Sequence, residues 1–176
     1  MAERVIALKF DGAAETGGRL IEHLAILFLP EQQIPALQKI IFHVPQQIFI
    51  ADASIRQNIA LGLEVDDISE ERVIESAKKS QLIDFINSLK EGLDTMVGEN
   101  GSKLSGGERQ RIGIARAFYE GGSILVLDEA TNALDMKTEN NIVEIIKGLD
   151  DDLMVIIVAH NLATIKNCDR VFILES

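Results

Sequence analysis

The stretch that decides the fold is Leu104–Asp135, which reads LSGGERQRIGIARAFYEGGSILVLDEATNALD. Its first residues predict the start of a helix, because Ser105 and Glu108 have the S-x-x-E spacing of a capping box. Gly106 and Gly107 place no side chain over the N–H groups of the first turn. A helix N-terminus with uncovered N–H groups and a favourable dipole binds phosphate, so this segment predicts an anion site.

A buried strand with carboxylates at its end follows this helix. Gly121 is expected to end the helix, and the apolar run Ile124–Leu127 suits a parallel strand that is buried on both faces. Asp128 and Glu129 follow at the carboxyl end of that strand, where open α/β sheets place their ligands. One carboxylate can hold Mg²⁺, directly or through water, and the next can polarise an attacking water.

Three motifs in this stretch resemble the nucleotide-binding domain of an ABC transporter. Leu104–Glu108 resembles the signature motif, Ile124–Glu129 the Walker B strand, and Ala133–Asp135 the D-loop. A capping box alone is common, whereas three such motifs in this order and within this distance are very specific. The resemblance implies ATP and Mg²⁺ as cofactors, with Asp128 as a metal ligand and Glu129 as the catalytic residue that activates water.

Composition agrees with one folded domain over residues 1–176. The net charge of −11 argues against a nucleic-acid partner, although backbone N–H groups can still hold phosphates. Cys168 is the only cysteine, so no disulfide forms within the chain, which fits a reducing compartment. The apolar run Leu153–Ala159 is too short to span a bilayer, and no signal-peptide pattern opens the chain. We therefore expect a cytoplasmic location, or one at the cytoplasmic face of the membrane through a membrane-spanning partner on another chain or since lost.

The segment that precedes these motifs has the layout of a phosphate-binding loop. Arg4–Phe10 predicts a strand, Asp11–Gly18 a glycine-rich turn and Arg19–Leu29 a helix. The family also has an aromatic residue that stacks on adenine upstream of this loop, and Phe10 lies too close to the loop to match it. The small antiparallel β subdomain of the family and the chain termini therefore look reduced.

The loop itself departs from the Walker A pattern G-x-x-x-x-G-K-[ST]. Gly12 and Gly17 keep the glycine spacing, but Gly18 stands where Lys belongs and Arg19 where Ser or Thr belongs. In a second register Arg19 takes the Lys position and no hydroxyl residue follows. Both registers lack the Lys and the Mg²⁺-binding hydroxyl, and a flat guanidinium does not replace a compact ammonium. A decayed P-loop and an ordinary glycine-rich turn are the two interpretations.

Two loops between these regions resemble those of exporters. The predicted strand Ile40–Val44 leads into Gln46, which resembles the Q-loop glutamine that contacts Mg²⁺ or the attacking water. The segment Ile48–Gly62 that follows also resembles the exporter pattern. Thr95–Gly101 resembles the exporter x-loop, in which Glu99 would face a coupling helix of the membrane domain. A plain loop carboxylate is the alternative for Glu99.

An inserted helical subdomain is expected at about residues 54–105. The acidic run Asp66–Glu71 predicts an exposed helix start near Ser69, because acids favour the first turn of a helix. Further along, apolar residues fall on one helix face at four positions. These are Leu82, Phe85, Ile86 and Leu89.

The C-terminal part predicts a helix and two more strands. Apolar residues within Ile142–Leu149 have helical spacing, while Leu153–Val158 and Arg170–Leu174 read as strands. His160 follows the first of these strands, where the resemblance implies the switch histidine that contacts the γ-phosphate. A lone histidine is more often structural, but this position favours the catalytic role.

The predicted fold is α/β: a RecA-like P-loop NTPase core with a mostly parallel sheet, crossover helices and the inserted helical subdomain. The resemblance implies a head-to-tail dimer with a second nucleotide-binding domain, in which each ATP lies between the Walker A of one domain and the signature motif of the other. This chain would offer a nearly complete signature half beside a defective phosphate loop. Two functions stay open: the ATPase domain of an exporter, active weakly or only with a partner, and a non-catalytic remnant or binding module.

The defects of Gly12–Arg19 predict poor binding of ATP to the isolated chain. The Lys, the Mg²⁺-binding hydroxyl and the adenine-stacking aromatic are all missing, so we expect a dissociation constant above about 1 mM, or less than roughly 4 kcal/mol of binding free energy. Isothermal titration calorimetry measures this constant directly. A micromolar value would overturn this interpretation of the loop.

Overall fold

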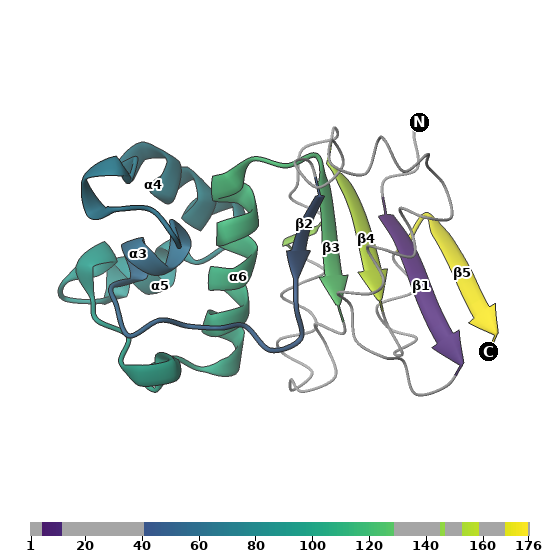
Figure 1. Cartoon of the computed structure of the whole chain (residues 1–176), viewed down its shortest axis with the longest axis horizontal. Coiled ribbons are helices and arrows are strands. Elements are labelled where there is room, and N and C mark those ends of the chain that lie inside the picture. Colours follow the sequence, from purple (N-terminus) through teal and green to yellow (C-terminus); the bar gives the residue numbers. More distant parts are fainter. Residues whose placement is uncertain (1–4, 12–40, 129–144, 147–152, 159–167, 176) are drawn as a thin grey trace. The chain divides into compact units, whose positions relative to one another are not determined.

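The computed structural model describes residues 5–11, 41–128, 145–146, 153–158 and 168–175, and it divides into two compact units (Figure 1). The first unit comprises residues 1–46, 122–139 and 150–176. The second comprises residues 47–121 and 140–149. The predicted helix Arg19–Leu29 and most of Ile142–Leu149 lie outside the described residues, although Ile145 and Ile146 are helical.

The first unit contains a five-stranded parallel sheet in the order β2-β3-β4-β1-β5. Its strands are β1 Val5–Asp11, β2 Ile41–Val44, β3 Ile124–Asp128, β4 Met154–Val158 and β5 Arg170–Glu175. All five strands were predicted from their apolar runs, and the α/β fold class with a parallel sheet is confirmed. Parallel neighbours need long crossover connections, which is why strands adjacent in the sheet are far apart in the sequence.

Strand β3 lies inside this sheet, between β2 and β4. Leu125 pairs with Phe42 on one side and with Val155 on the other. Successive side chains of a strand point to opposite faces, yet Leu125, Val126 and Leu127 are all buried. Both faces of β3 are therefore covered, as its continuous apolar run predicts.

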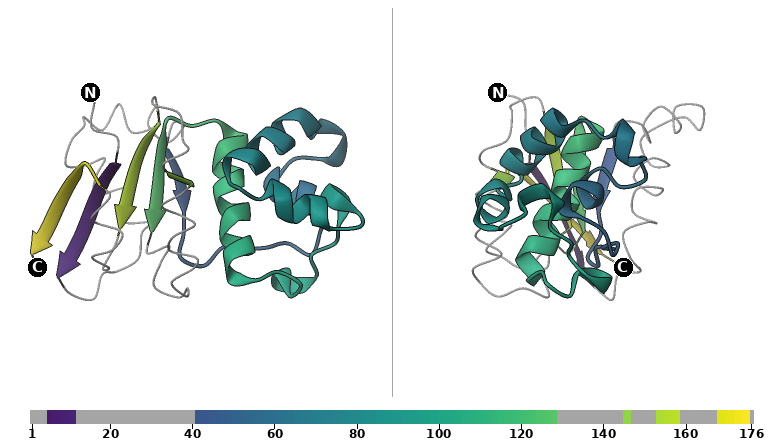
Figure 2. Two further views of the ribbon diagram at one scale, coloured as in Figure 1. Left: turned by 180° about the vertical axis from the view of Figure 1, so that it is seen from behind. Right: turned by 90° about the vertical axis from the view of Figure 1, so that its left-hand side faces the viewer.

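The second unit is helical. Within residues 47–121 its α-helices are α3 Ile55–Ile59, α4 Glu70–Lys79, α5 Ile83–Ser88 and α6 Gly106–Glu120. Three 3₁₀ turns join them: η2 Val65–Asp67, η3 Gly92–Asp94 and η4 Glu99–Gly101. Helix α6 is the longest of the described helices, and α3, α4 and α5 lie on one side of it (Figure 2).

Helix α6 packs its apolar face into the core of this unit. Ile112, Ala115 and Tyr119 recur at the i, i+3, i+7 spacing of one helix face, and all three are buried. They share one core with buried residues of the other helices and of the loops. These include Ile55, Ile59, Val73, Ala77, Leu82 and Ile86. Leu82 and Ile86 are buried in this core, and the partly buried Phe85 and Leu89 pack against it, so all four predicted positions face the core; Leu82 and Leu89 do so as the caps of α5.

The start of α4 is held by its predicted cap and by the end of α6. Ser69 is the N-cap, and its hydroxyl accepts a hydrogen bond from the Arg72 N–H. The Ser69 N–H in turn donates to the Tyr119 hydroxyl at 3.1 Å. The Arg72 guanidinium lies over the Tyr119 ring, 4.7 Å from its centroid, and donates to the Tyr119 carbonyl. These contacts join the first turn of α4 to the last turn of α6.

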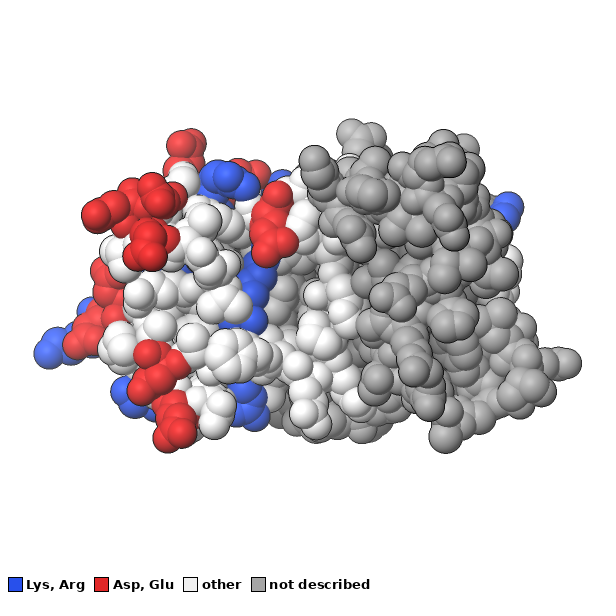
Figure 3. All heavy atoms as spheres, viewed as in Figure 1, with Lys and Arg blue, Asp and Glu red and all other residues white. Residues whose placement is uncertain are grey.

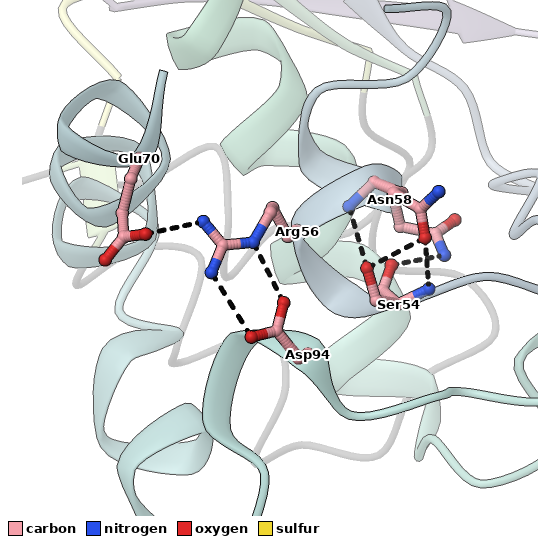
Figure 4. Close-up of polar contacts among 6 residues, drawn as sticks. Ser54, Arg56, Asn58, Glu70 and Asp94 are labelled. Atoms are coloured by element: carbon pink, nitrogen blue, oxygen red, sulfur yellow. Dashed lines mark hydrogen bonds and ion pairs between the residues drawn. The ribbon is translucent and has the colours of Figure 1, made fainter. Parts of the chain in front are cut away.

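Arg56 of α3 links two further parts of this unit (Figure 4). Its guanidinium donates to the Glu70 carboxylate at 2.8 Å and to the Asp94 carboxylate at 3.0 Å and 3.4 Å. The hydrogen bonds to Asp94, and then those to Glu70, raise the pKa of Arg56 above its usual value. Both carboxylates are largely exposed, so water screens these ion pairs and their contribution to stability is modest. In the view of Figure 3, acidic side chains gather in several groups over the helical unit.

A close approach of two loops predicts a stability difference between two glycine variants. Gly101 has φ +67°, and a Cβ there would lie 3.0 Å from the Ile50 Cγ2, whereas Gly121 has φ +82° with open space around it. Gly121→Ala should cost about 1 kcal/mol for the left-handed backbone alone. Gly101→Ala should cost about 2–4 kcal/mol, since the crowding of buried Ile50 is added. Urea unfolding of both variants checks this, and equal losses would contradict the close contact.

Candidate functional site

The start of helix α6 forms the reciprocal cap that the sequence predicts. Ser105 is the N-cap, and its Oγ accepts a hydrogen bond from the Glu108 N–H at 3.3 Å. The Glu108 carboxylate accepts from the Ser105 N–H at 2.7 Å. Two of the four N–H groups that a helix start leaves without intrahelical partners are therefore satisfied within the turn.

The other two N–H groups of this turn belong to Gly106 and Gly107. Among the residues that the structure describes, none accepts a hydrogen bond from either group. No Cβ covers them, and they stand at the positive end of the dipole of a 15-residue helix. Ser105 is exposed beside them. These donors fit an anion such as a phosphate group, whereas the Glu108 carboxylate adds one negative charge next to them.

The loop that precedes α6 is held in place by the hydrophobic core and by Arg109 of α6. Leu104 is buried in the helical core, so it positions Ser105 and does not present its side chain to a ligand. The Leu104 N–H donates to the Gly101 carbonyl at 2.9 Å. Arg109, one turn into α6, donates to the Leu104 carbonyl at 3.1 Å and to the Gly101 carbonyl at 3.4 Å. These hydrogen bonds hold the backbone of Gly101 and Leu104 against the first turns of α6, directly before Ser105.

Sequence reasoning missed Arg109 and also a buried polar residue, Asn58. The Asn58 side chain is fully buried in α3, where its amide bonds both the N–H and the carbonyl of Ala51. Its Nδ2 also donates to the carbonyl of Ser54, which lies beside it (Figure 4). The signal was an asparagine between Ile55 and Ile59 on an apolar helix face, because a buried amide must find partners.

Two of the predicted metal ligands stand at one edge of the sheet of the first unit. Val44 pairs with Leu127 near the carboxyl ends of β2 and β3, so Asp128 and Gln46 both come just after this pair. Gln46 is exposed. The carboxyl edge of a parallel sheet is where such folds bind ligands, and the backbone of both residues lies there.

The remaining predicted site residues lie outside the described residues. They are Gly12, Gly17, Gly18, Arg19, Glu129, Asp135 and His160. Their predicted roles stay predictions. Within the described ranges, no helix is both long enough and apolar enough to cross a membrane.

Comparison with known proteins places the chain in a family. Residues 10–132 match the family described as "ABC transporter". The "ATP-dependent lipid A-core flippase" of Pasteurella multocida is 40% identical over 147 residues, which are 84% of this chain and 25% of that protein. The "ABC-type transporter fsqE" of Aspergillus fumigatus is 42% identical over 132 residues, or 75% of this chain and 10% of that protein.

A solved structure supports the same assignment. It is titled "Structure of a bacterial Atm1-family ABC exporter with ATP bound", and it is similar with a TM-score of 0.77 and 33% identity over 98% of this chain and 32% of that chain. The chain thus spans a quarter or less of the curated relatives named above. The sequence and fold together show that the chain belongs to the ABC transporter family, in which it corresponds to the ABC domain of exporter-type transporters.

Proposed function

We propose that this chain works as an ATP-binding cassette in a pair, and that its start of α6 closes over an ATP held by the phosphate loop of a partner domain. The observation that carries this proposal is the pair of N–H groups at Gly106 and Gly107, which no described residue uses. The donors of this half-site all belong to Ser105–Gly107, and none belongs to the chain's own Gly12–Arg19 segment. The proposal therefore holds even where that segment binds ATP poorly.

Ser105 adds a third donor to this half-site. Its Oγ already accepts from the Glu108 N–H, and a hydroxyl that accepts can still donate its own hydrogen. The hydroxyl and the two glycine N–H groups would thus converge on the oxygens of a γ-phosphate. Hydrogen bonds to an anion are stronger than those between neutral groups, so three such donors can stabilise a closed pair.

The chain's own catalytic half is carried over from the family as part of this proposal. Asp128 and Gln46 would hold Mg²⁺, Glu129 would activate water, His160 would contact the γ-phosphate, and Asp135 would meet the partner at the D-loop. Mg²⁺, when bound, neutralises charge on the phosphate oxygens. Hydrolysis at this half needs a phosphate loop that holds ATP, which is why stand-alone activity should be weak or absent.

Coupling to transport needs a membrane-spanning partner. Glu99 lies in η4 with its side chain exposed, so it is available to a coupling helix of such a partner. The exporter relatives support this arrangement, with the chain on the cytoplasmic side of the membrane. The alternative function is that of a non-catalytic module that binds without turnover.

Mixing the chain with an intact exporter nucleotide-binding domain tests whether the start of α6 closes over an ATP held by a partner. The partner's catalytic Glu is changed to Gln, so that bound ATP persists. We expect a heterodimer that requires Mg-ATP, measured by size exclusion with light scattering, while the chain alone stays monomeric. Ser105→Arg should abolish the heterodimer because its side chain fills the phosphate site.

Two variants separate this effect from loss of the helix cap. Ser105→Ala loses the cap, at a cost of about 1 kcal/mol of stability, but leaves the site open, so pairing should weaken only modestly. Ser88→Arg makes the same substitution as Ser105→Arg at an exposed serine of α5 and should pair normally. Normal pairing by Ser105→Arg, or a partner that pairs only with itself, would favour the non-catalytic alternative.

Glu108→Gln tests the electrostatics of the same turn. A glutamine oxygen can still accept from the Ser105 N–H, but the negative charge beside the phosphate site is removed. We expect heterodimer affinity to rise about threefold to tenfold at low salt, with less gain at high salt. Stability should fall by about 0.5 kcal/mol, since an acid in the first helical turn is favourable. Unchanged affinity at low salt would mean that no phosphate approaches this turn.

A further inference from the structure

Arg116, three turns into α6, makes contacts that neither the core nor the proposed phosphate site accounts for. Its Nη1 donates to the Phe49 carbonyl at 2.6 Å. Its Nε donates to the Asn58 carbonyl at 2.5 Å, and its Nη2 to the Asn58 Oδ1 at 3.0 Å. One guanidinium thus joins α6 to the end of α3 and to the loop that precedes α3.

The acceptors of Arg116 are neutral, which makes its burial costly. Burial lowers the pKa of Arg116 to about 10, and Glu120 offsets part of this shift. The side chain is therefore still a cation at neutral pH. Among the described residues no carboxylate is bonded to this charge, so it needs good hydrogen-bond geometry, which the planar fork of arginine supplies and a lysine ammonium does not.

Asn58 extends this contact along the loop. Its Oδ1, which accepts from Arg116, also accepts from the Ala51 N–H at 2.9 Å. Its Nδ2 donates to the carbonyls of Ala51 at 3.0 Å and of Ser54 at 3.1 Å. The residues from Phe49 to Ser54, which we call the post-Q segment, are therefore held to α6 through one arginine and one asparagine. This segment begins three residues after Gln46.

The post-Q segment is also bonded to the loop that leads into α6. The Val97 N–H donates to the Ala53 carbonyl at 3.1 Å, and the N–H of Ile55, the residue directly after the segment, donates to the Thr95 carbonyl at 3.1 Å. Arg109 holds the far end of that loop, at Gly101, to the start of α6. Two routes thus connect the post-Q segment with Ser105–Gly107: one through Arg116 and the body of α6, the other through this loop.

We propose that Arg116 is a positioning residue that couples α6 to the post-Q segment, so that occupation of the Ser105–Gly107 site is transmitted to the residues next to Gln46. The transmission from the Ser105–Gly107 site rests on the proposed function, whereas the claim that Arg116 holds the post-Q segment to α6 does not. The chain would in this way relay the closed state of a partner's ATP to its own Q-loop. The Ala51 N–H is the reporter, because its hydrogen bond to the Asn58 Oδ1 depends on the orientation that Arg116 sets.

Amide hydrogen exchange of the full chain tests both claims: that Arg116 holds the post-Q segment, and that occupation of the Ser105–Gly107 site is transmitted to it. Arg116→Lys keeps the charge and removes the fork. Arg56→Lys is the matched control, because Arg56 also makes three hydrogen bonds, but to carboxylates of Glu70 and Asp94. In the free chain, Arg116→Lys should speed exchange of the Ala51 N–H about tenfold, and Arg56→Lys should leave it unchanged. Unchanged exchange in Arg116→Lys would overturn the claim that Arg116 holds the post-Q segment to α6.

The second arm repeats the measurement in the heterodimer with Mg-ATP. Pairing should slow exchange of the Ala51 N–H about fivefold in the wild type and in Arg56→Lys. In Arg116→Lys the pair should still form, but the response at Ala51 should be lost. A purely structural arginine would change the free-chain rate and leave the response intact, which would overturn the coupling. If no wild-type pair forms, the proposed function fails, and the free-chain arm still decides whether Arg116 holds the segment.

Discussion

The first turn of α6 determines both where this helix begins and where the proposed phosphate site lies. A helix must leave four N–H groups without intrahelical acceptors at its start. Here Ser105 and Glu108 satisfy two of them through the capping box, and the two glycine N–H groups have no acceptor among the described residues. Backbone N–H groups at a surface that have no acceptor within the protein donate to water or to a ligand. The local chemistry of four residues, Ser105 to Glu108, thus defines both where the helix begins and what can bind there.

The rest of the helical unit keeps this turn in place. Ile112, Ala115 and Tyr119 bury one face of α6, which fixes the helix axis in the core. Arg109 and Arg116 then hold loops to the helix through carbonyl groups, so the loops follow α6 rather than move independently. Apolar burial supplies most of the stability in such a unit, while the arginine contacts determine which segments share its position.

Local sequence patterns were sufficient to predict the helices and strands, but not the contacts between segments that are distant in the sequence. Apolar runs predicted the five strands, the S-x-x-E spacing predicted the cap, and Gly121 predicted the end of α6, where it adopts φ 82° and ψ 46°. The place of β1 between β4 and β5 depends on pairing between distant segments, which periodicity does not reveal. The Arg116 contacts were missed for the same reason, since its partner Asn58 lies 58 residues away. The roles predicted for Glu129 and His160 rest on the family resemblance, because these residues lie outside the described part of the chain.

Nuclear magnetic resonance of the glycine amides tests the central claim most directly. The chain has 13 glycines, so selective ¹⁵N-glycine labelling gives a spectrum in which Gly106 and Gly107 can be assigned by substitution. We expect both amide proton signals to move downfield when the unlabelled partner domain and Mg-ATP are added together, and neither to move with Mg-ATP alone. Signals that stay in place within a formed pair would contradict the claim that these two N–H groups hold the partner's nucleotide.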